Sequence, residues 1–267
     1  MSRWPRVWLF LLACSCNEVH GLATTQLVDG RGIDAPARCS MDTPVFAPNV
    51  RESVFRPCTD YTFAGGMAIA ACGITITTSR IAEGPIDGPL ADVAIMPSVP
   101  DAVLSEPRLT PDDDLLVTQR TSSTKRVSVY RRANGWVWDR DLPFTFATLE
   151  YAGVPSRGPQ RHLMITRSSM VEEFLDDGNN NWSLARTQPA SVFGVENFGS
   201  PMHLSADGLR AVFSAGSSVQ YAARPSVDVP FAGSSPLEVP LARDMFLSED
   251  CSRLYFSGLE RIFYVQR

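Results

Sequence analysis

The sequence predicts an all-β protein, a five-bladed β-propeller that is closed by an N-terminal strand. A short box with the pattern Leu-Ser/Thr-x-Asp recurs along the chain, and each copy precedes an alternating apolar run. Twenty prolines and eighteen glycines are spread over 267 residues, which suits frequent turns. No stretch keeps the apolar period of 3.6 residues that a long amphipathic helix requires. Repetition of one small β unit is typical of a circular array.

The repeat interval indicates five units. The turn aspartates of the box are Asp112, Asp207 and Asp250, separated by intervals of 95 and 43 residues. Because the first interval is about twice the second, it is expected to contain a degenerate copy, and residues 154–158 fit that place. One period before the first copy, Asp60 is the expected turn residue. Each unit is therefore about 43 to 52 residues long.

Each unit has a third and a fourth strand after the box. Tyr130, Tyr221 and Tyr264 mark third strands, and the last two lie 14 residues after their turn aspartates. Trp136 and Trp182 begin fourth strands shortly after Asn-Gly and Asp-Gly pairs. Those pairs favour tight hairpins because their residues tolerate positive φ. Four antiparallel strands form one propeller blade, and we expect the Trp and Tyr side chains to pack between blades.

The last unit stops at Arg267 after its third strand, which would leave a strand edge unpaired. Residues 39–50 precede the first blade and contain a short apolar core, Thr-Pro-Val-Phe, at 43–46. We expect this segment to lie beside residues 260–267, to supply the missing strand and to close the ring.

The N-terminal residues are typical of a targeting segment. Two arginines precede a short apolar run, residues 7–13, which suffices for a signal peptide but not for a membrane span. The run ends in Leu-Leu-Ala immediately before Cys14, a pattern that resembles the lipobox of bacterial lipoproteins. Cys14 is then the expected lipidated residue. Lipidation at Cys16 and an ordinary cleaved signal are the alternatives.

These signals divide the chain into a signal peptide at 1–13, a lipid-anchored tether at 14–38 and a propeller domain at 39–267. The predicted location is the bacterial cell envelope, at the outer membrane or facing the periplasm. Without the signal the chain has 22 basic and 29 acidic residues, a net charge of about −7, which argues against nucleic-acid binding. We expect a monomer that contacts the membrane through its lipid.

Four cysteines lie in the predicted propeller domain: Cys39, Cys58, Cys72 and Cys251. An even number in an oxidising compartment permits two disulfides, with three possible pairings. No CxxC pair or Cys/His cluster has the spacing of zinc ligands, so we expect no structural zinc.

One copy of the box carries a family resemblance. The run Leu204-Ser205-Ala206-Asp207-Gly208, continued through Phe213, is similar to the TolB-like propeller repeat of exported bacterial proteins. The resemblance covers most of residues 53–267, although the other copies match it in part. It implies a propeller in the cell envelope and transfers no catalytic residue. The Ser and Asp of the box are expected to make turns by hydrogen-bonding backbone N–H groups.

Several motifs resemble catalytic or metal sites but fit ordinary loops better. Ser-x-x-Lys at 122–125 lacks the helix and companion motifs of penicillin-binding enzymes, so we interpret it as a hairpin loop. Asp-x-Asn-x-Asn at 177–181 lacks the glycine and glutamate of a calcium loop. The aspartate run at 112–114 fits a solvated turn. We therefore expect no metal and no cofactor.

The three histidines, His20, His162 and His203, are too scattered to predict a site. His203 holds the strand position that Arg108 and Phe246 hold in other units, which favours a role in blade packing. A separate cluster of basic residues lies along one predicted strand, and alternation would place at least half of it in solvent. Its members are Lys125, Arg126, Arg131 and Arg132.

The predicted function is a non-enzymatic binding or scaffold module whose propeller binds a protein, a peptide or a glycan. This prediction follows from the architecture and from the lack of a catalytic constellation. It is an analogy with other propellers, because fold does not determine function. The competing hypothesis is a glycoside hydrolase or other carbohydrate-active enzyme, which needs two carboxylates facing each other in a central pocket. Acidic residues just before the apolar runs keep it open: Glu52, Glu106, Glu150, Glu196 and Asp244.

Overall fold

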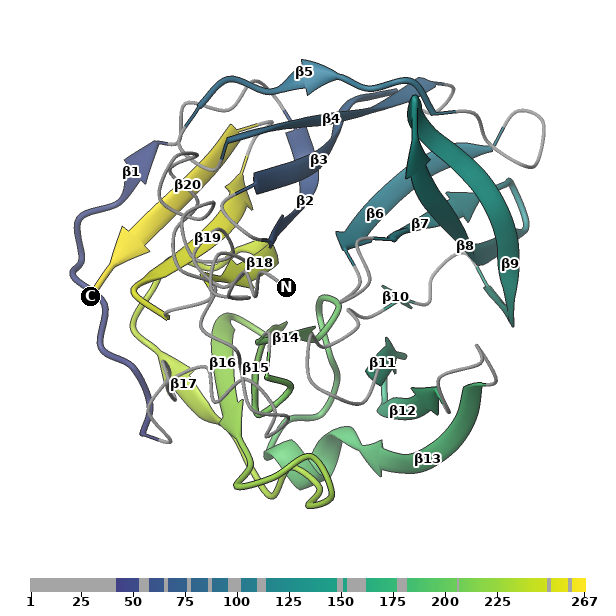
Figure 1. Cartoon of the computed structure of the whole chain (residues 1–267). Helices are drawn as coiled ribbons and strands as arrows, with labels where there is room; N and C mark the ends of the chain where they lie inside the picture. The colour runs from purple at the N-terminus through teal and green to yellow at the C-terminus, as the bar shows by residue number, and fades with distance from the viewer. Residues whose placement is uncertain are drawn as a thin grey trace, which may run out of the picture. The chain divides into compact units, whose positions relative to one another are not determined.

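The computed structural model forms a five-bladed β-propeller (Figure 1). It describes residues 42–52, 58–64, 67–75, 78–85, 88–95, 102–109, 114–147, 151–152, 162–176, 182–205, 207–248, 251–258 and 261–267. Five four-stranded antiparallel sheets succeed one another around a common axis. One short 3₁₀ helix, η1 (Ala190–Phe193), interrupts the strands in the described chain. Among these residues no helix has the length and hydrophobicity needed to span a bilayer.

The five blades follow the chain in order. Blade 1 contains β2 (Cys58–Ala64), β3 (Met67–Thr75), β4 (Thr78–Pro85) and β5 (Ala91–Asp92). Blade 2 contains β6 (Val103–Leu109), β7 (Leu115–Arg120), β8 (Thr124–Ala133) and β9 (Gly135–Ala147). Blade 3 contains β10 (Tyr151–Ala152), β11 (His162–Thr166), β12 (Met170–Asp176) and β13 (Trp182–Pro189). Blade 4 contains β14 (His203–Leu204), β15 (Arg210–Ala215), β16 (Ser218–Ala223) and β17 (Ser235–Leu237).

Blade 5 is completed by the N-terminal part of the described chain. It contains β18 (Arg243–Leu247), β19 (Arg253–Gly258), β20 (Arg261–Gln266) and, as its fourth strand, β1 (Arg51–Glu52). Figure 1 shows the first strand of each blade nearest the axis and β1 at the rim beside β20. The sequence-based expectation of closure beside residues 260–267 is therefore correct.

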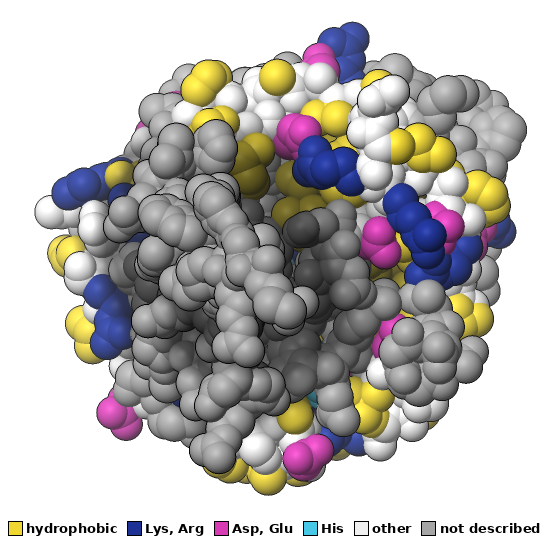
Figure 2. Space-filling model, viewed as in Figure 1, with side chains coloured by type: hydrophobic (Ala, Val, Ile, Leu, Met, Phe, Trp, Pro, Cys, Tyr) yellow, Lys and Arg dark blue, Asp and Glu magenta, His cyan; other side chains and the backbone are white. Residues whose placement is uncertain are grey.

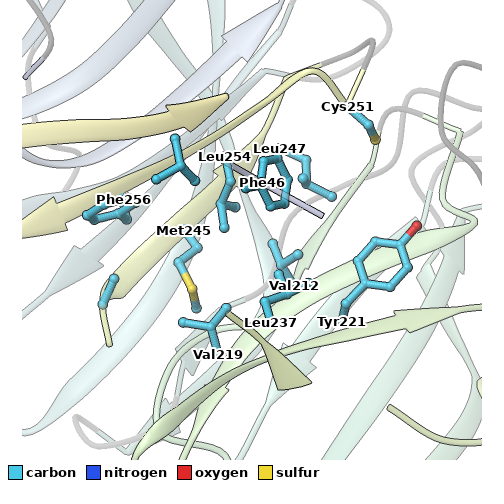
Figure 3. Packing of buried hydrophobic residues seen from close by; sticks show 12 residues of the cluster. Phe46, Val212, Val219, Tyr221, Leu237, Met245, Leu247, Cys251, Leu254 and Phe256 are labelled. Atoms are coloured by element: carbon cyan, nitrogen blue, oxygen red, sulfur yellow. The ribbon is translucent and has the colours of Figure 1, made fainter. Parts of the chain in front are cut away.

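The closing segment lies slightly further along the chain than the expected 39–50. Arg51 pairs with Tyr264, and Ala47 N donates to the Gln266 carbonyl at 2.7 Å. Phe46 enters the core between blades 4 and 5, where it is 6% exposed. Figure 3 shows its ring beside Leu247 and Leu254. The segment thus closes the ring through a short ladder and one buried aromatic ring.

Apolar side chains from adjacent blades form a cluster at each of the five interfaces. Trp136 and Tyr130 pack between blades 1 and 2, and Trp182 packs against the cluster between blades 2 and 3. Tyr221 belongs to the cluster between blades 4 and 5 in Figure 3, and Tyr264 borders the one between blades 5 and 1. These aromatic residues pack between blades as predicted, and their burial contributes about 25 cal/mol per Å² of apolar surface.

The box at residues 204–210 forms the turn that its residues predict. Ser205 Oγ accepts the Arg210 N–H at 3.0 Å and donates to Asp207 Oδ1 at 2.5 Å. Asp207 Oδ1 also accepts the Leu209 N–H at 3.0 Å. Gly208 has φ of 69°, a left-handed conformation that glycine adopts without steric cost. Ser205 and Asp207 therefore act as turn-makers.

The other copies of the box differ in detail. Ser248 Oγ accepts the Arg253 N–H at 2.9 Å, as its counterpart does in blade 4. Cys251 stands at the glycine position with φ of 51°, and it is disulfide-bonded. Asp112 and Asp250 lie outside the described residues. The prediction that Asp60 makes a turn is wrong, because Asp60 lies within β2 opposite Ala71 and that strand continues to Ala64.

One of the expected disulfides joins Cys58 to Cys72. These residues face each other across β2 and β3, and both are buried. Cys39 and the predicted lipidation residue Cys14 lie outside the described residues.

Candidate functional site on the inner strand of blade 2

The inner strand β6 of blade 2 contains a β-bulge. Its pairing with β7 changes register between Ser105, which faces Thr118, and Arg108, which faces Leu116. Glu106 within the bulge has φ of 50°, which is uncommon for a residue with a side chain. Bulges redirect side chains and are frequent near functional sites. This one places two charged side chains, Glu106 and Arg108, in the protein interior.

Glu106 is buried in an ion pair. Lys125 Nζ, on β8, lies 3.4 Å from Glu106 Oε1, and Thr118 Oγ1 donates to Glu106 Oε2 at 2.8 Å. The side chains of Glu106 and Lys125 are 10% and 5% exposed. Each charge compensates the desolvation of the other. The pair thus ties the inner strand of blade 2 to its third strand.

Arg108 connects three inner strands. Its guanidinium donates to the carbonyls of Pro107 at 2.7 Å and of Tyr61, on β2, at 3.3 Å. Nη2 lies 3.5 Å from His203 Nδ1, on β14. Burial, and then the charge of Arg108, lower the pKa of His203 well below its usual value, so the imidazole is neutral. The ring of Phe246, on β18, lies edge to face against the imidazole of His203, with 6.4 Å between the two ring centroids.

Arg108, His203 and Phe246 are the equivalent positions that the repeat alignment identified, and all three are buried. Their mutual contacts place them in one layer of the inner strands. His203 therefore contributes to packing between blades, as the sequence predicted. This layer links the inner strands of different blades. No described residue in it forms a pair of a nucleophile and a general base.

A second buried carboxylate lies between blades 3 and 4. Glu173 contacts His162 Nδ1 at 2.7 Å, Arg224 at 2.9 and 3.0 Å, and Arg186 Nε at 2.9 Å. Burial alone would raise the pKa of Glu173. Hydrogen bonds from His162 and Arg224 and the positive charges of Arg224 and Arg186 outweigh burial and lower that pKa to about 2.

A third polar cluster leads from the interior of blade 2 to its rim. Gln119 Nε2 donates to Ser128 Oγ at 2.5 Å, and Ser128 Oγ donates to Asp141 Oδ1 at 2.5 Å. Asp141 also accepts from Trp138 Nε1 at 3.1 Å and from Arg126 Nη1 at 2.7 Å. Although burial opposes the change, these hydrogen bonds and the charge of Arg126 lower the pKa of Asp141. The carboxylate is therefore ionised and held in place.

Of the five acids of the enzyme hypothesis, Glu106 and Asp244 lie at equivalent places, each at a register shift in the inner strand of its blade. Glu106 is the one that the structure describes as a buried inner-strand side chain. Glu52 lies on the closing strand β1 and Glu196 lies in the exposed loop after η1, so neither lies on the inner strand of a blade as the hypothesis required. Glu150 and the side chain of Asp244 lie outside the described part of the structure.

The remaining sequence motifs have ordinary surroundings where they are described. Ser122 and Ser123 are exposed in the hairpin between β7 and β8. Arg131 and Arg132 are exposed, which agrees with the expectation that at least half of the basic cluster lies in solvent. Lys125 is buried, because it forms an ion pair with Glu106. His20, the calcium-like run at 177–181 and the aspartates at 112–113 lie outside the described residues. No group of three or more His, Cys, Asp or Glu side chains within the described ranges is placed to hold a metal ion.

Sequence reasoning missed the two buried ionic clusters. Glu106 and Lys125 are 19 residues apart, and Glu173 and Arg224 are 51 residues apart and belong to different blades. One signal was available for the first pair, since Lys125 is the single lysine among 24 basic residues. The second pair has no local signal, because it forms only when blades 3 and 4 pack together.

No family model and no curated protein sequence matches this chain. Solved structures resemble it in fold. An exo-β-1,3-galactanase from Phanerochaete chrysosporium has 9% identity and a TM-score of 0.51, with 81% of this chain and 64% of that one covered. A periplasmic gluconolactonase from Pseudomonas aeruginosa has 17% identity and a TM-score of 0.48, with 79% and 66% covered.

A protein of unknown function from Desulfotomaculum acetoxidans has 15% identity and a TM-score of 0.49, with 75% of this chain and 62% of that one covered. The chain spans somewhat less than two thirds of the length of the galactanase and of this protein. At such identities the likeness concerns the propeller fold alone.

Proposed function

We propose that this chain is a non-enzymatic binding or scaffold module of the bacterial cell envelope, anchored by a lipid at Cys14. The observation that carries the proposal is the environment of Glu106. Its carboxylate is buried, in an ion pair with Lys125 and with a hydrogen bond from Thr118. A carboxylate held in a buried ion pair of this kind contributes to the packing of blade 2. The propeller is then a rigid support for surface binding.

The envelope location is supported by the sequence. The lipobox-like run before Cys14 and the similarity of residues 204–213 to the TolB-like repeat both favour an exported lipoprotein. The disulfide between Cys58 and Cys72 agrees with an oxidising compartment.

An activity screen tests the non-enzymatic part of the proposal. Purified full chain is incubated with nitrophenyl glycosides, β-1,3-linked galactan and glucono-lactone, and products are followed by absorbance and chromatography. We expect no turnover above the uncatalysed rate. Hydrolysis that disappears in Glu106→Gln or Asp244→Asn would instead establish a carboxylate enzyme.

Metabolic labelling with a radioactive fatty acid tests the anchor. We expect Cys14→Ala to abolish labelling and to release the protein in soluble form, because the acceptor thiol is lost. Cys16→Ala is the matched control and should keep full labelling. Labelling that survives the first substitution and is lost in the second would move the anchor to Cys16.

A further inference from the structure

We propose that the rim of blade 2 carries a glycan-binding subsite in which Trp138 stacks on a sugar ring. The subsite, called the Trp138 platform, consists of Trp138, Asp141 and Arg126. This inference rests on the proposed function as a binding module, and it names the class of ligand and the surface involved.

Trp138 is a large apolar side chain that the fold leaves in solvent. It is 45% exposed, whereas Trp136, two residues earlier on β9, is 3% exposed. Trp136 is covered because Ala94 and Ile95 pair with its backbone and Arg132 lies over its ring at 4.3 Å. The rim strand β5 of blade 1 has only two residues. Packing in the core therefore explains why a tryptophan stands at position 136. It does not explain the exposed tryptophan at position 138.

The exposed indole ring is held in a fixed orientation. Its Nε1 donates to Asp141 Oδ1 at 3.1 Å, and the same oxygen accepts from Ser128 Oγ at 2.5 Å. Ser128 in turn accepts from Gln119, and both of these side chains are at most 1% exposed. A surface ring organised by a buried hydrogen-bond chain loses little conformational entropy when a ligand stacks on it.

The polar groups beside the ring match the edge of a sugar. Arg126 Nη1 lies 2.7 Å from Asp141 Oδ2, so a hydrogen-bond donor and an acceptor are adjacent, and the Arg126 side chain is 39% exposed. A sugar presents an apolar C–H face for the aromatic ring and hydroxyl groups that both donate and accept. Because the two charges neutralise each other, the platform favours a neutral ligand over a strongly acidic or basic one.

The surroundings disfavour the other classes of partner. Two register shifts in the pairing of β8 with β9, together with Pro143, interrupt the edge of β9 and oppose addition of a partner strand. Basic and acidic side chains lie side by side over β8 and β9 on the face shown in Figure 2, whereas anionic membranes attract clustered basic residues. A small aromatic platform with paired charges fits one or two sugar units.

Isothermal calorimetry on the purified full chain tests the platform. The probes are tetrasaccharides of β-1,4-linked glucose, of β-1,4-linked N-acetylglucosamine and of α-1,6-linked mannose. We expect saturable binding of at least one probe. Trp138→Ala should weaken it about tenfold or more, and Arg126→Ala should weaken it by a similar factor through loss of a charge-assisted hydrogen bond. Trp138→Phe, which keeps an aromatic face, should weaken it less.

Leu184→Ala is the matched control, because Leu184 is 53% exposed on β13, the rim strand of blade 3. It should leave the affinity unchanged. Equal affinity of wild type and Trp138→Ala for a bound probe would overturn the platform and leave the binding function intact. Lack of saturable binding to all three probes would overturn the glycan assignment. Cleavage of a probe would overturn the proposed non-enzymatic function itself.

Discussion

At the scale of single residues, the propeller buries carboxylates together with basic side chains. Glu106 lies against Lys125, and Glu173 lies against two arginines and a histidine. A buried ion needs such partners because desolvation removes its interaction with water. Removing one partner leaves an uncompensated charge, whereas removing both charges is far less harmful.

A two-residue cycle tests this argument at Glu106 and Lys125. We expect Lys125→Met to lower the free energy of unfolding by about 3–5 kcal/mol, since the Glu106 carboxylate is then buried alone. Adding Glu106→Gln should recover part of the loss. Urea denaturation measures both. As a control, Arg80→Met removes an exposed ion pair with Asp92 and should change stability by less than about 1 kcal/mol. A double variant as unstable as the single one would contradict the ion-pair account.

Glu173 makes stability depend on acid pH. Its pKa of about 2 in the folded protein lies below the ordinary 4.5, so its contribution is complete above about pH 4.5 and disappears as pH falls toward 2. The difference corresponds to about 3 kcal/mol of unfolding free energy. Urea denaturation between pH 6 and 3 should show a steeper decline in wild type than in Glu173→Gln. Glu172→Gln, which affects the partly exposed neighbour paired with Arg167, should keep the wild-type slope.

At the scale of elements, a repeated turn joins the first and second strands of the blades. In blade 4 the side chains of Ser205 and Asp207 replace backbone partners, and Gly208 supplies the left-handed residue. Blade 5 keeps the serine and places Cys251 at the glycine position. Blade 1 lacks the box at this turn, because β2 continues to Ala64 and β3 begins at Met67. One turn chemistry is therefore favoured but not obligatory.

Substitution of the turn serine tests its part in the blade. We expect Ser205→Ala to lower the free energy of unfolding by about 1–3 kcal/mol, because the buried Arg210 N–H loses its acceptor. Thermal unfolding followed by circular dichroism measures the change. Ser122→Ala, in the exposed β7–β8 hairpin, is the control and should have little effect. An equal loss of unfolding free energy in the two variants would show that the hydrogen bond of Ser205 does not stabilise the blade.

At the scale of the whole molecule, the ring depends on the segment that joins its two ends. Blade 5 receives its fourth strand from residues that precede blade 1 in the chain. The ladder is short, so the buried ring of Phe46 supplies much of the attachment. Such closure couples the first and last blades in one cooperative unit.

Truncation of one side chain tests the closure. We expect Phe46→Ala to lower the free energy of unfolding by about 3–5 kcal/mol, because it leaves a cavity between blades 4 and 5. Val45→Ala affects the adjacent side chain, which is 80% exposed, and should be nearly neutral. Guanidinium denaturation compares the two. Similar midpoints would mean that the segment does not hold the ring closed.

The sequence by itself determined the number of blades, closure of the ring by residues that precede blade 1, the interblade positions of Trp136 and Tyr221, and the packing role of His203. All of these follow from local periodicity and from alignment of one unit with another. Only the tertiary structure decided that Lys125 is buried against Glu106, that Glu173 meets Arg224, and that Trp138 is exposed while Trp136 is covered. Those outcomes depend on a bulge, on the packing of separate blades and on the length of a neighbouring rim strand. None of these is encoded in the spacing of residues within one unit.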